Sequence, residues 1–336
     1  MWVISHFSGK NRIIRLLDII RVIMKRNLFV TSNRLGDAVL TTGILHYLIK
    51  QEPDIPVTVI CGTIPADIFA AIPQVERVIT LRKEKYNRHW IKAAIKAGPH
   101  FWNRIVDYRG SIFSIMPARH RHIWTGGDDT VHKTVANARL IGVDHAIPPL
   151  IIPSAADLAK TVRLLNLQTD KRPILALAPT ANFDQKQWHH ENFLNLAKTL
   201  TGESGVLHGA RIAILGAPGE EEQAMPVVEG LPSDQIINLV GKTTPLEAAC
   251  YLSHASLFVG NDSGLMHSAV AVGIPTVGLF GIGKPVVYGP SGKHTLLIKG
   301  APEGQPIHLP PRGDNDVLPL SRVSREIEAF FNSLSQ

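Results

Sequence analysis

The chain has 336 residues, 45% of them hydrophobic and 19% charged, which excludes a disordered or fibrous protein and predicts a globular one of two domains. Its two cysteines, Cys61 and Cys250, lie far apart and at no metal-ligand spacing, so we expect no disulfide framework and a cytosolic protein. The net charge of +7 favours an anionic partner: nucleic acid, an anionic membrane or a phosphorylated substrate.

The first segment, residues 1–26, is basic and has an apolar stripe at helical spacing, which predicts an amphipathic helix. Its charged residues are Lys10, Arg12, Arg15, Arg21, Lys25 and Arg26, against Asp18. Its stripe consists of Ile13, Leu17, Ile20 and Met24. The segment is too short and too charged to span a bilayer and has no signal-peptide cleavage site. We expect it to pack on the first domain, to lie on an anionic membrane surface, or both.

From Asn27 onward, apolar runs alternate with helical patterns. The predicted strands are "NLFVTS", "PVTVIC", "RVITL" and "NRIVDY", and the predicted helices cover 37–50 and 66–71. This alternation indicates βαβ units and a parallel sheet. We assign residues 27–160 to this first domain. The stretch from Ala146 to Arg172, which holds proline-bounded extended chain and one helix, is interpreted as the link between the domains.

A second alternating series follows over residues 161–318. Its predicted strands are "PILALAP", "RIAILG", "IINLVG", "ASLFVG" and "PTVGLFG", and its predicted helices lie near 190–200, after Gly219, at 245–252 and directly after "ASLFVG". A last helix is predicted within 319–336. The fold class is therefore α/β, with two Rossmann-like domains that face a central cleft and bind ligands at the carboxyl ends of both sets of strands.

Several short motifs resemble known sites without completing them. "VGKTT" lacks the first glycine of a P-loop, because Ile236 stands there, and "GIGKPV" lacks the third glycine of a dinucleotide fingerprint. "ARHRH" at 118–122 has no interleaved aromatic residues and is more typical of a solvated helix end than of a nucleic-acid site. His189 and His190 have no cysteine or carboxylate partner at metal-ligand spacing, so we expect them to begin a helix.

The stretch "GNDSGLMHSAVAVGIPTVGLFG", residues 260–281, places Asp262, Ser263 and Gly264 at a turn from a strand to a helix. The free N–H groups and positive dipole of a helix N-terminus bind phosphate oxygens. Asp262 can accept hydrogen bonds from sugar hydroxyls, and His267, about one turn later, can point toward the same anion. The alternative is that Asp262 or Ser263 only caps the helix and that His267 belongs to the core.

This stretch is similar to the hallmark of glycosyltransferase family 9, the ADP-heptose:lipopolysaccharide heptosyltransferases. The family pattern is roughly D-[ST]-G-x-x-H-x-A-x-A-x-x-x-P-x-x-x-L-F-G. Further resemblances follow in the family's order: "RLGDAVLTTGIL", "DYRGS", "KQW" and "LGAPGEEE". Together they run from Arg34 to Gly281.

The resemblance implies a GT-B architecture, with the acceptor bound mainly by residues 27–160 and the nucleotide-sugar by residues 161–318. The helix in 319–336 is expected to cross back to the first domain. The implied reaction is an inverting displacement at the anomeric carbon that needs no metal and no cofactor.

The resemblance also implies roles for individual residues. Asp37 matches the family's proposed base, although it is also placed to cap the helix that follows it. Lys186 matches the phosphate-binding lysine, and Glu220 the nucleotide-side glutamate. The other expected contacts to the nucleotide-sugar are Thr180, Asn182, Lys242, Thr243, Asp262, Ser263, Gly264 and His267. The expected acceptor-side residues are Arg34, Gly36 and Arg109.

Two positions depart from the family pattern. Gly43 stands where proline is usual, which affects helix geometry more than chemistry, and Gln187 replaces a frequent arginine. The leading hypothesis is transfer of heptose from ADP-heptose to a lipopolysaccharide inner-core acceptor at the cytosolic face of the inner membrane, with no nucleic-acid partner. The alternatives are the same fold with another nucleotide-sugar donor or glycan acceptor, and a nucleotide-sugar-binding protein without turnover.

Overall fold

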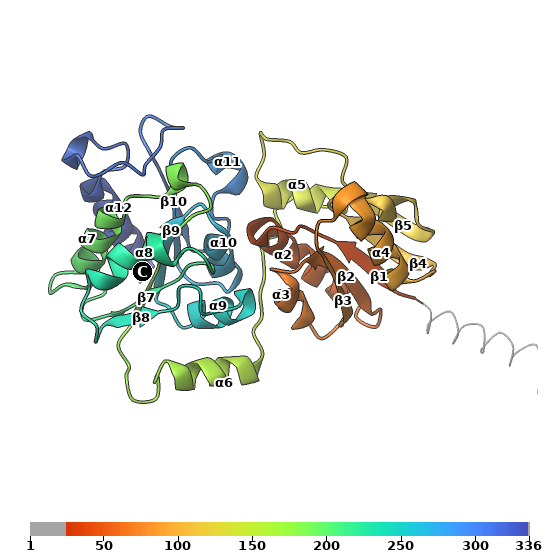
Figure 1. Ribbon diagram of the computed structural model, residues 1–336, viewed down its shortest axis with the longest axis horizontal. Helices are drawn as coiled ribbons and strands as arrows, with labels where there is room; N and C mark the ends of the chain where they lie inside the picture. The colour runs from red at the N-terminus through yellow and green to blue at the C-terminus, as the bar shows by residue number, and fades with distance from the viewer. Residues whose placement is uncertain (1–24, 335–336) are drawn as a thin grey trace, which may run out of the picture.

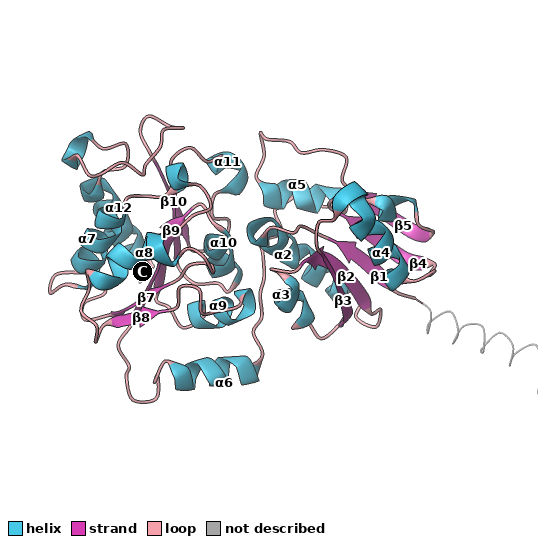
Figure 2. Ribbon diagram, viewed as in Figure 1, coloured by secondary structure: helices cyan, strands magenta, loops and turns pink. Residues whose placement is uncertain are grey.

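The computed structural model describes residues 25–334 as two α/β domains joined by a linker (Figure 1). The helix expected over residues 1–26 therefore lies almost wholly outside the described residues. Each domain is a parallel sheet with helices on both faces, as Figure 2 shows. The expected pair of Rossmann-like domains is confirmed.

The first domain has a five-stranded sheet of order β3-β2-β1-β4-β5. Its strands are β1 (Asn27–Val30), β2 (Val57–Gly62), β3 (Val75–Leu81), β4 (Trp102–Asp107) and β5 (Ala118–Ile123). Its helices are α2 (Leu35–Gln51), α3 (Ala66–Ala70), α4 (Arg88–Ala97) and α5 (Lys133–Leu140), with short 3₁₀ turns η1 (Lys85–Asn87) and η2 (Ile112–Ile115). Helices α2, α3 and α5 share one apolar core with one face of the sheet, and α4 and η2 share another core with the opposite face.

The second domain has a six-stranded sheet of order β11-β10-β9-β6-β7-β8. Its strands are β6 (Ile174–Ala178), β7 (Arg211–Ile214), β8 (Ile236–Asn238), β9 (Leu257–Asn261), β10 (Thr276–Phe280) and β11 (Thr295–Lys299). Its helices are α7 (His190–Thr201), α8 (Glu221–Glu229), α9 (Pro245–Leu252), α10 (Gly264–Ala271), α11 (Pro285–Tyr288) and α12 (Leu320–Ser333), with 3₁₀ turns η3 (Asp184–Lys186) and η4 (Gly313–Asn315).

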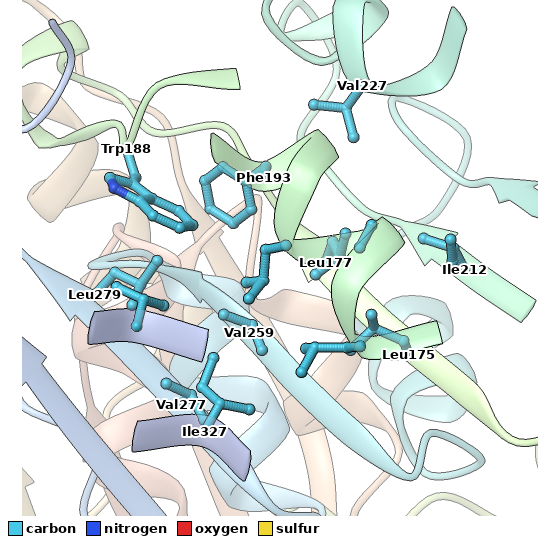
Figure 3. Close-up of a cluster of buried hydrophobic side chains, with 14 of the residues drawn as sticks. Leu175, Leu177, Trp188, Phe193, Ile212, Val227, Val259, Val277, Leu279 and Ile327 are labelled. Atoms are coloured by element: carbon cyan, nitrogen blue, oxygen red, sulfur yellow. The ribbon is translucent and has the colours of Figure 1, made fainter. Parts of the chain in front are cut away.

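The strands of continuous apolar sequence form the centre of each sheet. β1, β6, β9 and β10 are buried along their whole length, as expected for parallel strands covered on both faces. Figure 3 shows one face of the second-domain core, where Trp188 and Phe193 pack edge to face with ring centroids 5.2 Å apart. Each large side chain buried in this way contributes about 2 kcal/mol to stability.

Five helices and strands were not predicted from the sequence: α4, β5, α5, α11 and β11. Of these, β5 corrects an interpretation, because "ARHRH" forms an edge strand that pairs with β4 and is not a helix end. It is an edge strand with β4 as its one sheet neighbour among the described strands, and its side chains are largely exposed. The continuous apolar run that marks a central parallel strand is therefore absent.

Helix α12 also differs from expectation. It packs on α7 and β11 of its own domain instead of crossing back to the first domain. Val323 and Ile327, one helical turn apart, are fully buried in the second-domain core, and this apolar stripe determines where the helix lies.

The linker contains α6 (Ala155–Leu164), which packs on α9 of the second domain. The expected boundary at residues 160 and 161 falls inside this helix. Before α6, the chain passes from the first domain to the second. The Leu150 N–H donates to the Thr42 hydroxyl of α2 at 2.9 Å, and the next N–H, of Ile151, donates to the Ala271 carbonyl of α10 at 2.9 Å. The first-domain side of the boundary is therefore near residue 150.

Gly43, in the middle of α2, lies against this linker. A Cβ atom at position 43 would overlap the carbonyl oxygen of Pro148. The glycine is thus required by the close approach of the linker, a role that the sequence did not reveal.

We predict that Gly43→Ala lowers the free energy of unfolding by about 1–3 kcal/mol, because the linker backbone must move to admit the methyl group. Gly127→Ala is the matched control, since its Cβ would meet only ordinary contact with Trp124. Urea denaturation of both variants measures the difference. Equal stability of the two variants would contradict the packing role of Gly43.

Candidate active site

The two sheets present their topological switch points to each other. In the first domain, β1 and β4 are neighbours, and the strands that follow them, β2 and β5, lie on opposite sides of this pair. In the second domain β6 and β9 have the same relation, with β7 and β10 on opposite sides. Ligands of such sheets bind at the carboxyl ends of these strands. The loops that follow these four strands, together with the first turns of α2 and α10, contain most of the predicted site residues.

The N-termini of α2 and α10 meet across the cleft. A Cβ at Gly36 would lie 3.1 Å from His267 Cδ2, and a Cβ at Gly264 would lie 2.8 Å from Leu35 Cγ. A methyl group at position 264 would force Leu35 to move, and one at position 36 would press against the His267 ring, so the two glycines favour this close approach. Neither N-cap residue, Arg34 or Ser263, makes a side-chain capping hydrogen bond. Two positive helix ends therefore converge on one point of the cleft.

The structure tests the alternative that Asp37, Asp262 or Ser263 only caps a helix. Asp37 is the third residue of α2, and Arg34 occupies the N-cap position. In α10 the Ser263 side chain does not cap the helix, and Asp262 forms an ion pair instead. By contrast, α9 has a complete capping box between Thr244 and Glu247. The N-termini of α2 and α10 therefore differ from that of α9 in having no side-chain cap among the described residues.

Asp37 opens into a cavity of about 420 Å³ at the carboxyl edge of the first-domain sheet. The predicted acceptor-side residues Arg34 and Arg109 line the same cavity. The full lining is Thr31, Ser32, Asn33, Arg34, Asp37, Thr41, Tyr108, Arg109, Lys133, Asn137 and Tyr288. Tyr288 comes from α11, so the second domain closes one wall.

Eight of these eleven lining residues were not predicted as site residues, and Lys133 and Tyr288 are two of them. Lys133, the first residue of α5, lies with Nζ 4.0 Å from the centre of the Trp124 ring. Burial lowers the pKa of the Lys133 ammonium, and the negative charges of Asp37 and Asp129 act in the opposite direction. Burial raises the pKa of the Tyr288 hydroxyl, and the charge of Asp37 raises it further. Neither residue belongs to a recognisable motif, so no sequence signal identified them.

The loop between β6 and α7 positions Lys186 against the second helix end. Lys186 Nζ donates to Asp262 Oδ2 at 2.5 Å, and the Asp262 side chain is only 10% exposed. Trp188 anchors the loop: its N–H donates to Asn261 Oδ1 at 2.9 Å, and its indole N–H donates to the Leu318 carbonyl at 2.8 Å. Asn261 directly precedes Asp262, and its hydrogen bond to Trp188 helps to position the Lys186 loop. It lies within the motif of residues 260–281 but was not predicted as a site residue.

Thr180 and Glu220 form a unit beside this loop. Thr180 Oγ1 donates to Glu220 Oε2 at 2.5 Å, and the same oxygen accepts from the Ala217 N–H at 2.8 Å. Thr180 is almost fully buried. Its hydroxyl therefore fixes the Glu220 carboxylate, which lies at the carboxyl end of β7.

His267 is buried between the two helix ends. Burial, together with the nearby charges of His132 and Lys186, lowers the pKa of its imidazole to about 3, so the ring is neutral at physiological pH. Its Nδ1 atom and the Ser263 hydroxyl are both buried and have no hydrogen-bond partner among residues 25–334. Buried polar groups are normally paired, so a ligand at this point would satisfy both.

Three predicted site residues, Asn182, Lys242 and Thr243, make no contact of this kind with the residues around the two helix ends in the described part of the chain. Asn182 is exposed, and Lys242 donates to the Asn238 carbonyl of its own turn at 3.1 Å. Within residues 25–334, no hydrogen bond or ion pair links Asn182, Lys242 or Thr243 to another predicted site residue. Gln187, at the family's arginine position, donates to the Gln223 side chain at 2.9 Å.

Direct contacts hold the domains together on both sides of the site. His132 Nε2 and the Gly289 carbonyl are 2.8 Å apart, and Lys284 forms an ion pair with Asp129. On the linker side, Asp67 Oδ2 accepts from the Leu246 N–H at 2.9 Å beside an apolar cluster that both domains share. The cleft is thus bounded at both ends.

One group of possible metal ligands was found in the described part of the chain. His189, His190 and Glu191 bring their ligand atoms within 4.8 Å of one another, so a carboxylate partner exists that the sequence analysis did not count. The His189 side chain accepts from the Glu191 N–H and caps α7, as expected for helix initiation. The positive end of a helix disfavours a cation there.

Comparison with known proteins identifies the family. The family model described as "Glycosyltransferase family 9 (heptosyltransferase)" matches residues 114–306. The chain is also 30% identical over 309 residues to lipopolysaccharide heptosyltransferase 2 of Escherichia coli K12, a match that covers 81% of this chain and 87% of that protein. The chain belongs to glycosyltransferase family 9. It is therefore a glycosyltransferase, and the resemblance found in the sequence is confirmed.

Other family 9 members agree in fold. Lipooligosaccharide heptosyltransferase 2 of Haemophilus influenzae is 31% identical over 160 residues, which cover 46% of this chain and 45% of that protein. The solved structure of "E. coli ADP-heptose lps heptosyltransferase II" superposes with a TM-score of 0.69 at 19% identity, covering 93% of this chain and all of that one. The GT-B architecture expected for family 9 is thereby confirmed.

We predict that His267 makes stability depend on pH. Its pKa is about 3 in the folded protein and about 6.5 when unfolded, so only the unfolded state takes up a proton as the pH falls below 6.5. Stability is therefore lost as the pH falls from about 6.5 toward 3. In His267→Gln, the slope of unfolding free energy against pH should decrease by about 1 kcal/mol per pH unit between pH 5 and 6.

Urea denaturation at several pH values measures this slope. Ser268→Ala, a substitution of the buried and non-titrating neighbour, should change stability by the same amount at every pH. An unaltered slope in His267→Gln would show that His267 is not held neutral.

Proposed function

We propose that this protein transfers a heptose from ADP-heptose to an inner-core acceptor of lipopolysaccharide, with inversion at the anomeric carbon and without a metal ion. The observation that carries the proposal is the meeting of the α2 and α10 N-termini between Lys186 and Asp37. A site for a diphosphate thus lies directly beside a carboxylate in a cavity of substrate size. The names of the family relatives, which are lipopolysaccharide heptosyltransferases, support the donor and acceptor.

The diphosphate of the donor binds at the first turn of α10. The N–H groups after Ser263 and Gly264 donate to its oxygens, and Lys186 supplies a full positive charge. Asp262 uses one of the three ammonium donors of Lys186 and leaves the others for phosphate. Neutral His267 satisfies its unpartnered Nδ1 against the same ligand. The Glu220 carboxylate, fixed by Thr180, accepts hydrogen bonds from the ribose.

The acceptor binds in the cavity of the first domain. Its attacking hydroxyl gives its proton to the Asp37 carboxylate while its oxygen forms the bond to the anomeric carbon. The bond from that carbon to the diphosphate breaks on the opposite face, and ADP leaves with the additional negative charge. Arg34, Arg109 and Lys133, all in this cavity, attract the acidic groups of an inner-core acceptor.

The charges that the protein supplies support the proposal that no metal ion is needed. Lys186 and the helix ends stabilise the charge that develops on ADP, which is the task that a divalent cation performs in other transferases. Among residues 25–334, no helix has the length and apolar character needed to cross a membrane. We propose a cytoplasmic enzyme that reaches its acceptor at the inner face of the inner membrane.

A donor panel tests this function directly. Purified protein is mixed with heptose-deficient lipopolysaccharide and EDTA, together with ADP-heptose or with UDP- and GDP-linked sugars, and nucleotide release is measured. We expect acceptor-dependent release from ADP-heptose alone. Turnover of a different donor would keep the reaction but replace the substrate, and binding of donors without any turnover would favour the non-catalytic alternative.

We predict that Asp37→Asn lowers the rate of transfer at least about 100-fold, because the amide cannot take the acceptor proton. The dissociation constant for ADP should change less than about twofold, since Asp37 lies on the acceptor side. Initial rates and calorimetric titration with ADP give the two numbers.

Asp54→Asn, which changes an exposed carboxylate of the same domain, is the control and should retain the normal rate. Transfer by Asp37→Asn at the rate of the control would remove Asp37 from the role of base.

A further inference from the structure

We propose that the first domain binds an anionic membrane through one defined surface, the α4–η2 surface. It consists of the exposed apolar residues on and around α4 and η2 and of the basic residues between them. The apolar members are Tyr86, Ile91, Ile95, Phe101, Ile112 and Ile115. Its basic members on α4 are Arg88, Lys92 and Lys96. The proposal rests on the proposed function only in that a lipid-linked acceptor gives the contact its purpose.

Helix α4 packs with its bulky apolar residues outward. Its buried positions are His89, Ala93 and Ala97, one turn apart, and the two alanines let the helix lie close to the sheet. Ile91 and Ile95, also one turn apart, are 59% and 75% exposed. A helix that served only to cover the sheet would bury its isoleucines and expose its alanines. The described residues leave this isoleucine stripe uncovered.

The stripe continues on both sides of α4. Tyr86, 93% exposed, stands in the turn before the helix, and this residue and Asn87 both have a φ of 56°, which is costly for residues other than glycine. On the other side, η2 buries Phe113 in the same core as Ala93 and leaves Ile115 exposed. Apolar residues thus extend beyond a single helix, over the face of the sheet opposite α2 and α3 (Figure 1).

The segment that forms this surface is rich in positive charge. Residues 82–121 contain ten lysines and arginines and only two acids. Not all of them belong to the surface, because Arg104 pairs with Glu52 and Arg109 lines the acceptor cavity. The basic residues on α4 itself are exposed, and the one acid beside them, Glu84, is paired with Lys92. The α4–η2 surface is therefore both apolar and positive.

This combination fits a membrane better than a protein. Interfacial helices carry lysine and arginine on one side and isoleucine-sized or aromatic residues on the other, and they lie in the plane of the headgroups. Lysine stems extend along the apolar layer while their ammonium groups contact phosphates. Protein interfaces, in contrast, are depleted in lysine at their core. Helix α4, about 15 Å long, has the size to insert one apolar side in this way.

One chain segment connects the surface to the acceptor cavity. Arg109 lines the cavity together with Asp37, and the chain continues directly from Arg109 through Ser111 into η2, where Ile112 is exposed. The placement thus links the membrane contact to the side of the cleft proposed for the acceptor.

Vesicle flotation with the full chain tests the proposal in the absence of donor and acceptor. The vesicles contain either phosphatidylcholine alone or phosphatidylcholine with 30% phosphatidylglycerol. We expect binding to the anionic vesicles that weakens with added salt. Both Ile91→Ser/Ile95→Ser and Lys92→Gln/Lys96→Gln should bind at least tenfold more weakly, and the lysine variant should also lose part of the salt dependence.

The matched control is Ile152→Ser/Leu164→Ser, which removes two equally exposed apolar residues from the linker region and should bind like the unaltered protein. Unaltered binding of both α4 variants would place the membrane contact outside this surface, and absence of binding by the unaltered protein would exclude a membrane partner. Either result overturns the proposal.

Activity on a water-soluble, delipidated acceptor separates this proposal from the proposed function. The α4 variants should retain full turnover of that acceptor and lose turnover of vesicle-embedded acceptor at least tenfold. Equal turnover of both acceptor forms by the variants would contradict the proposal. Vesicle binding without turnover of any donor would overturn the function and leave the membrane surface in place.

Discussion

The close approach of the α2 and α10 N-termini is the constraint on which the cleft depends. Two positive helix ends repel each other, and the glycines that permit the approach remove apolar contact at the same point. The cost is offset nearby, where Val39 and Ile151 pack with Ala271 in an apolar cluster shared by both domains. The fold thus holds two positive helix N-termini close together, an arrangement that favours the binding of an anion between them. It supports the diphosphate site proposed above.

Most of the supporting structure fixes the loops around that point. Trp188 holds the Lys186 loop through Asn261 and through the segment before α12, which is why α12 and the second-domain core contribute to a distant site. Asp107, the last residue of β4, accepts hydrogen bonds from the Arg109 and Ser111 N–H groups and shapes the opposite loop. Charged side chains at the cleft are therefore positioned by buried neighbours, and little of the geometry depends on exposed ion pairs.

The fold was predictable where burial follows the sequence. Central strands such as "ILALA" are continuous apolar runs, and the Asp262–His267 turn lies in a long motif, so both were found. Edge strand β5 is too polar to read as a strand, and Lys133 enters the site only because α5 folds back beside Trp124. The crossing of α12 was an assumption about the family, and the stripe of Val323 and Ile327 overrides it. The sequence of a segment can predict whether it forms a helix or a strand. The contacts between domains depend on how several segments pack together, which no single segment predicts.

A crystal structure of the complex with ADP tests the central claim most directly. The account predicts that the diphosphate lies at the first turn of α10, with the backbone N–H groups after Ser263 within about 3 Å of its oxygens and with Lys186 on the same phosphate. It further predicts that Asp37 stays clear of the nucleotide and faces the open cavity. A diphosphate bound elsewhere in the cleft, with the two helix ends unoccupied, would contradict the account.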